Sequence, residues 1–202
     1  MSRCTLSPSV KTIIVAIAML TLSGRCYSEP IPSTTFSDGF KQSHLSCSII
    51  TSEHLTILQL YQRGLNKDVA IKSLPNISRG ARSRVKYVYD LAEKIGILNA
   101  YSDINTNFSR CSTLVHKFNG KPALDQKEHA YYFCSGENKV RFEILLQLND
   151  NKTIDQIAET LPVKYLHTIN NYRNVMNNKG LLATFDLLAN NLKSCLNLIE
   201  DR

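Results

Sequence analysis

Four of the six cysteines are the residues whose type and spacing point most directly to chemistry; the other two, Cys4 and Cys26, lie in residues 1–28, a predicted signal peptide that is removed on export. Cys47, Cys111, Cys134 and Cys195 lie far apart in the chain, and none of them belongs to a Cys-x-x-Cys pair. A zinc site or a redox-active dithiol needs such close pairs, so neither is expected. An even number of cysteines in an oxidising compartment instead predicts two disulfide bonds. Spacing alone leaves all three pairings open.

The histidines and carboxylates form no catalytic or metal-binding motif. The histidines are His44, His54, His116, His129 and His167, and none makes His-x-x-x-His or His-Glu-x-x-His with a neighbour. The chain also lacks a Gly-x-Ser-x-Gly elbow and a glycine-rich phosphate loop. We therefore expect no catalytic residue, no metal and no cofactor. A hydrolase stays open as an alternative, with a site in a cleft that carries a histidine or paired carboxylates such as Glu143, Asp155 and Glu159.

A cationic cluster is the first candidate binding surface. Arg79, Arg82 and Lys86 fall on one face of a predicted helix, and Arg84 lies nearby. Such a face can bind an anion or an acidic partner. The alternative is an ordinary solvated helix face, with Asp90 one turn after Lys86 to offset its charge.

An aromatic segment is the second candidate surface. Tyr131, Tyr132 and Phe133 directly precede Cys134. They can pack the second half of the chain against the first, or they can form an exposed anchor for a protein partner, because tyrosine is favoured at interfaces.

Composition and the first residues predict a helical, exported protein. The chain has 202 residues, 43% hydrophobic, with no Trp, 8 Gly and 6 Pro, which favours helices. Arg3 and Lys11 precede the apolar run 12–22, which is too short to span a bilayer, and small residues follow it. Residues 1–28 therefore read as a signal peptide, and we expect a periplasmic or secreted protein with no transmembrane segment. A lipoprotein signal is disfavoured because Arg25 directly precedes Cys26.

The net charge argues against nucleic acid as a partner. The formal charge of +7 falls to +4 once residues 1–28 are removed, because three basic residues and no acid leave with them. Binding to phosphate backbones needs a denser cationic surface than this. We therefore expect a protein partner and no nucleic acid.

An internal repeat organises the rest of the chain. A shift of 87 residues places Cys134 on Cys47 and Leu161-Pro162 on Leu74-Pro75. After a three-residue deletion, a shift of 84 places Gly180 on Gly96 and Cys195 on Cys111. Each copy then runs from cysteine to cysteine, which predicts the pairs Cys47–Cys111 and Cys134–Cys195. At a shift of 87 the basic cluster falls on Leu166, Ile169 and Arg173, so the repeat does not need it to fold.

The expected fold class is all-α, with two tandem disulfide-stapled four-helix modules after the signal peptide. The domains are a mobile tail (29–46), module 1 (47–111), a connector (112–133) and module 2 (134–202). In module 1 the helices end near Gly64, Pro75, Gly96 and Cys111, and the last begins near Ser102. Val69, Ala70 and Leu74 are expected to face inward, and Asn76 or Ser78 to cap the third helix.

The pattern of these two modules resembles small exported helical modules of proteobacteria. In size, compartment and stapled helices the chain is also similar to periplasmic immunity proteins. This similarity is architectural and carries over no functional residue. The absence of catalytic motifs, the export signal and the two candidate surfaces predict a non-catalytic protein that binds another macromolecule, as an inhibitor, immunity protein or assembly factor. The other alternative is a small-ligand or lipid carrier with a pocket lined by residues such as Tyr89, Phe142 and Tyr172.

Overall fold

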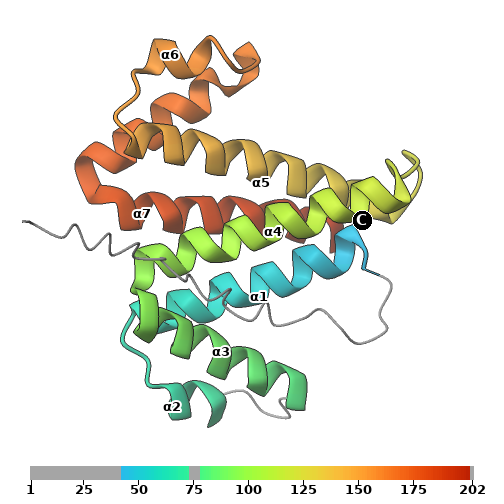
Figure 1. Ribbon diagram of the computed structural model, residues 1–202, viewed down its shortest axis with the longest axis vertical. Coiled ribbons are helices and arrows are strands. Elements are labelled where there is room, and N and C mark those ends of the chain that lie inside the picture. Colours follow the sequence, from blue (N-terminus) through green and yellow to red (C-terminus); the bar gives the residue numbers. More distant parts are fainter. Residues whose placement is uncertain (1–41, 73–77, 201–202) are drawn as a thin grey trace, which may run out of the picture. The chain divides into compact units, whose positions relative to one another are not determined.

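Helices account for all the regular structure of residues 42–72 and 78–200, the part of the chain that this computed structural model describes (Figure 1). This confirms the all-α class. The predicted signal peptide, most of the predicted tail and Leu74, Pro75 and Asn76 lie outside these residues. The elements are α1 (His44–Gln62), α2 (Lys67–Lys72), α3 (Arg79–Ile95), α4 (Ile97–Asn119), α5 (Lys127–Asn149), α6 (Ile154–Ala158), η1 (Val163–Tyr165) and α7 (Leu166–Glu200).

Two disulfide bonds each join the first and last helix of one half of the chain. Cys47 of α1 pairs with Cys111 of α4, and Cys134 of α5 pairs with Cys195 of α7. This is the pairing that the internal repeat predicts. The bonds close loops of 64 and 61 residues. Loops of this length restrict the unfolded chain by about 4 kcal/mol each in the loop-entropy account.

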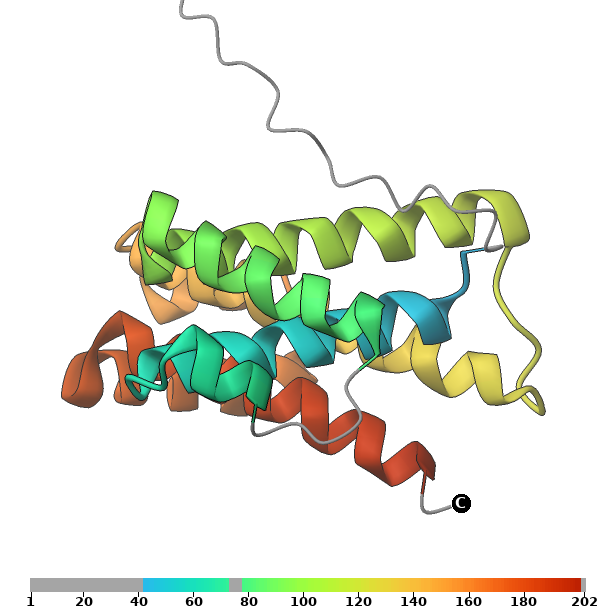
Figure 2. The ribbon, with the colours of Figure 1, turned by 90° about the horizontal axis from the view of Figure 1, so that it is seen from below.

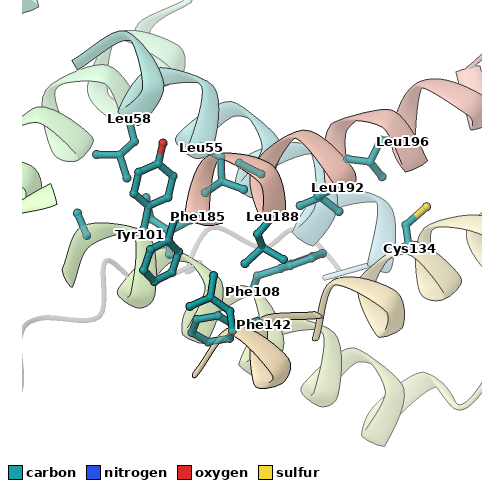
Figure 3. Close-up of a cluster of buried hydrophobic side chains, with 14 of the residues drawn as sticks. Leu55, Leu58, Tyr101, Phe108, Cys134, Phe142, Phe185, Leu188, Leu192 and Leu196 are labelled. Atoms are coloured by element: carbon teal, nitrogen blue, oxygen red, sulfur yellow. The ribbon is translucent and has the colours of Figure 1, made fainter. Parts of the chain in front are cut away.

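The core lies between four long helices, α1, α4, α5 and α7. Each of α1 and α4 packs against both α5 and α7, so the two halves of the chain share one apolar interior. Figure 3 shows side chains from all four helices meeting there. They include Leu55, Leu58, Tyr101, Phe108, Phe142, Phe185, Leu188 and Leu192, all 6% exposed or less.

A polar network also ties the halves together. Asp186 of α7 accepts hydrogen bonds from Tyr101 of α4 at 2.7 Å and from Gln59 and Gln62 of α1 at 3.1 and 2.7 Å. Because hydrogen bonds to a charged group in a partly buried site are among the stronger ones, Asp186 fixes α7 against α1 and α4. Because the two halves share one core and are joined by these hydrogen bonds, the structure does not confirm two separate tandem modules.

The order of elements nevertheless repeats between the halves. A long helix, a short helix and two further helices run from α1 to α4, and again from α5 through α6 to the two parts of α7, which bends at Gly180. Gly96 and Gly180 have φ of 80° and 84° with extended ψ, a conformation almost confined to glycine. Figures 1 and 2 show α2 and α3 on one side of the long helices, and α6 on the other.

Helix bounds differ from the expected ones at the start of α1 and around the connector. Residues 44–46, expected in the tail, form the first turn of α1, because Ser43 caps this helix and Glu128 of α5 accepts the backbone N–H groups of His44 and Leu45. The connector shrinks from 112–133 to 120–126, because α4 continues to Asn119 and α5 begins at Lys127.

The start of α4, the buried side of α2 and the cap of α3 were also predicted. α4 begins directly after Gly96 rather than near Ser102. Ala70 is buried as expected, but Val69 is 49% exposed and does not face inward. Ser78 caps α3 by accepting a hydrogen bond from the Ala81 N–H at 3.1 Å.

Within the described residues, no helix is both long and apolar enough to cross a membrane.

Candidate binding surfaces

The outer face of α3 carries the predicted basic cluster. Val85 and Val88 are 1% and 0% exposed and turn the inner face of α3 towards α1 and α4. Arg79, Arg82 and Lys86 are exposed on the opposite side. We call these three residues the basic face.

Nearby ion pairs define which cations belong to this face. Arg84 is partly buried and pairs with Glu53 of α1, its Nε lying 2.7 Å from Oε2, so it fastens α3 to α1 instead of extending the basic face. Asp90, expected to offset Lys86, instead pairs with Lys67 of α2 at 2.9 Å. Within residues 42–72 and 78–200, no member of the basic face forms an ion pair.

His54 lies beside this junction, below the surface. Its ring centroid is 5.5 Å from that of Tyr87 on α3, and its buried Nε2 has no hydrogen-bond partner among the described residues. Burial, reinforced by the positive charge of Arg84, lowers the pKa of His54 to about 4. The imidazole is therefore neutral near pH 7 and adds no charge to the basic face.

Burial corrects the repeat register for the third helix of each half. A shift of 84, not 87, matches the buried Val85 and Val88 with the equally buried Ile169 and Tyr172. The three-residue deletion therefore precedes this helix. The counterparts of the basic face become Val163, Leu166 and Asn170, of which the first two are 86% and 42% exposed apolar residues.

The aromatic segment does not form one surface. It lies in the first turns of α5, where Tyr131 is 3% exposed and packs in the core, whereas Phe133 is 54% exposed. Tyr132 is partly buried. Of these three aromatic residues, only Phe133 has the exposure that a contact with a partner would need.

Tyr132 is the centre of a histidine cluster that the sequence did not reveal. The rings of His44, His116 and His129 lie with centroids 5.1, 5.5 and 6.0 Å from the Tyr132 ring. These histidines come from three helices, so local spacing could have indicated only the pair of His129 and Tyr132, three residues apart on α5. Ser112 lies 3.2 Å from Nδ1 of His44, which is fully buried.

The chemistry open to this cluster is limited. Burial lowers the pKa of His44, an effect that the nearby Glu128 opposes and His116 strengthens. The described residues hold no group of three or more His, Cys, Asp or Glu side chains arranged to bind a metal ion. Around the Tyr132 ring the cluster brings together the start of α1, the end of α4 and the start of α5, with the His44 imidazole closed to solvent.

The described residues form a groove between α4 and α5. It has a volume of about 420 Å³. Its lining comprises Thr106, Ser109, Arg110, Thr113 and Leu114 of α4 with Lys139, Phe142, Glu143 and Leu146 of α5. Of the three residues expected to line a carrier pocket, only Phe142 reaches it. Tyr89 and Tyr172 are buried elsewhere and hydrogen-bond to the Leu65 carbonyl and the Asn191 amide.

Comparisons with protein families, with curated proteins and with solved structures find no match for this chain.

Proposed function

We propose that this protein is an exported, non-catalytic binding protein, and that the basic face of α3 contacts an acidic surface of another protein. The partner would be one that the protein inhibits, neutralises or helps to assemble. Residues 1–28 would direct export and leave the mature chain in the periplasm or outside the cell. The two disulfides support an oxidising destination.

The observation that carries this proposal is the contrast among neighbouring cations. Arg84 and Lys67 have acidic partners that hold helices together. Arg79, Arg82 and Lys86 have no ionic partner within the described residues, and their counterparts in the second half are uncharged. The fold therefore does not need these three charges, which leaves them available for recognition.

The scaffold beneath the basic face is rigid, which favours binding. Tyr89 of α3 donates a hydrogen bond to the Leu65 carbonyl at 2.7 Å, and the Arg84–Glu53 pair fixes the same helix to α1. The Cys47–Cys111 disulfide then holds α1 against α4. Because the helix is already ordered, binding loses less conformational entropy than it would on a mobile loop.

The repeat adds a second, different outward face. We propose that the two halves descend from one duplicated four-helix unit, as the order of elements and the matched glycines support. In that case the unlike faces at Arg79–Lys86 and Val163–Asn170 arose on equivalent positions. Proteins that bind macromolecules commonly diversify surfaces in this way while keeping one core.

The proposal is tested by comparing how much partner is captured by wild type and by a basic-face variant. Immobilised protein with Arg79→Gln, Arg82→Gln and Lys86→Gln combined would be compared with wild type on extracts of the source organism, with mass spectrometry of what is retained. Each exposed ion pair contributes about 0.5 kcal/mol, so losing three weakens binding about tenfold. The binding of wild type should also weaken as salt is raised.

A matched triple variant controls for the loss of net charge. Lys117, Lys121 and Lys127 are exposed lysines on and beside the α4–α5 connection, and changing them to Gln removes the same charge elsewhere. This control should retain the partner, and both triple variants should melt close to wild type. The proposal would be contradicted if wild type and both triple variants retained equal amounts of the partner, or if wild type retained no partner at all.

A further inference from the structure

We propose that the groove between α4 and α5 is a binding site for small amphiphilic anions, molecules with one carboxylate, sulfonate or phosphate head and an apolar tail. This goes beyond the proposed function, because it concerns a small ligand at other helices.

The floor and walls of the groove suit an apolar tail. Phe142 is 6% exposed and forms the floor, continuous with the core. Leu114 of α4 and Leu146 of α5 are 40% and 37% exposed and present apolar surface from the two sides. A volume of about 420 Å³ lies within the range of small-molecule sites, about 300–1,000 Å³. Covering these side chains removes apolar surface from water, which favours binding.

The charges at the groove suit an anionic head. Arg110 of α4 and Lys139 of α5 both line it and are exposed, against a single acidic residue, Glu143. Arg110 is partly engaged, because its Nη1 lies 3.5 Å from Oδ1 of Asn107 and its charge acts on Asp103. Lys139 forms no ion pair within the described part of the chain, so it is the stronger anchor.

The arrangement favours a small ligand over an extended partner. The two cations come from opposite helices and border the same concave site. Hydroxyl groups of Thr106, Ser109 and Thr113 line the same groove and can donate further hydrogen bonds. The basic face of α3, by contrast, is a row of cations along one helix, without a groove of its own among those described.

The probe for this site is 8-anilinonaphthalene-1-sulfonate, an apolar sulfonate whose fluorescence rises in apolar surroundings. Wild type should show saturable binding at one site. Dodecanoate should displace the probe, and dodecyltrimethylammonium, which has a similar tail and the opposite charge, should not.

Two variants and two matched controls locate the site. Lys139→Gln should weaken probe binding about two- to threefold, the effect of losing one exposed charge contact, and Leu146→Ser about fivefold, the effect of losing part of an apolar wall. Lys117→Gln removes an exposed lysine of α4 outside the lining. Leu98→Ser removes a leucine that is 38% exposed, almost the same as Leu146. Both controls should bind as wild type, and circular dichroism should show all four variants folded.

Several results would overturn the proposal. They are binding that does not saturate, equal displacement by the cationic amphiphile, or unchanged affinity in both Lys139→Gln and Leu146→Ser. Vesicles containing phosphatidylglycerol distinguish the source of the head group: pelleting of wild type but not of Lys139→Gln assigns a membrane lipid, whereas displacement by dodecanoate without pelleting assigns a free amphiphile. The basic-face variants should bind the probe normally, so this proposal and the proposed function can fail separately.

Discussion

Acid should destabilise this protein through His54, the imidazole that lies between α1 and α3. In the folded state its pKa is lowered to about 4, first by burial and then by Arg84, from an ordinary value of 6.5. Between these two values the unfolded chain holds a proton at His54 that the folded chain does not. Protons therefore favour unfolding there, and the stability that is present above about pH 6.5 falls as the pH is lowered towards about 4.

The size of the effect follows from the two pKa values. The free energy of unfolding should fall by about 2 kcal/mol between about pH 7.5 and about pH 5 from this group alone. His54→Phe removes the titration, keeps a ring against Tyr87 and eliminates the buried Nε2 that lacks a partner. The variant should match wild type or exceed it in stability near pH 7.5, and it should exceed wild type by about 2 kcal/mol more at about pH 5.

Urea unfolding followed by far-ultraviolet circular dichroism at several pH values measures this difference. The series stops at about pH 5, above the range in which most carboxyl groups titrate. His167→Gln, which removes an exposed histidine of α7, controls for the loss of one titratable residue and should keep the pH dependence of wild type. If the stability curves of wild type and His54→Phe run parallel between these pH values, the burial argument is refuted.

Three further predictions concern stability. Replacing Cys134 and Cys195 together by Ser opens a loop of 61 residues and should lower the free energy of unfolding by about 4 kcal/mol, measured by urea denaturation. Gly180→Ala forces an L side chain into φ 84° and should lower the melting temperature by an amount equivalent to about 1–3 kcal/mol, whereas Gly136→Ala, inside α5 with equally open space around it, should stabilise by about 0.5–1 kcal/mol. Burial alone would raise the pKa of Glu137, but hydrogen bonds from Lys164 and Tyr165 outweigh it and lower the pKa below 4.5. In the same urea assay, Glu137→Gln should therefore lower the free energy of unfolding by its full amount above about pH 4.5. The loss should become smaller as acid protonates Glu137 in the folded wild type.

Local chemistry made much of the fold predictable. The matched cysteines indicated the disulfide pairs, and Gly96 and Gly180 marked the ends of helices because their backbone conformation excludes other residues. The helix ends around the connector were not predictable in this way. Asn119-Gly120 does end α4, but residues 112–119, expected in the connector, stay helical although Val115, at 3% exposure, is the one buried residue among them. Contacts between the halves, such as those of Asp186, also depend on residues far apart in sequence.

The same limit applied to the candidate surfaces. Periodicity placed Arg79, Arg82 and Lys86 together on a helix, and they are exposed together. It could not reveal that Arg84 forms an ion pair with Glu53 on another helix and so does not belong to the basic face. Nor could three consecutive aromatic residues show that Tyr131 is buried, because a helix turns neighbouring side chains to different sides.

The third helix of each half separates positions that the core constrains from positions that it does not. Val85 and Ile169, and likewise Val88 and Tyr172, occupy matching positions and are buried in the same interior. These positions are constrained because any change in volume there disturbs a packed core. Their outward neighbours carry no such constraint, and there the halves differ completely: one presents three cations, the other Val163, Leu166 and Asn170. The basic face gathers like charges against their mutual repulsion although the fold does not need them, and under the proposed function an acidic partner would offset that repulsion.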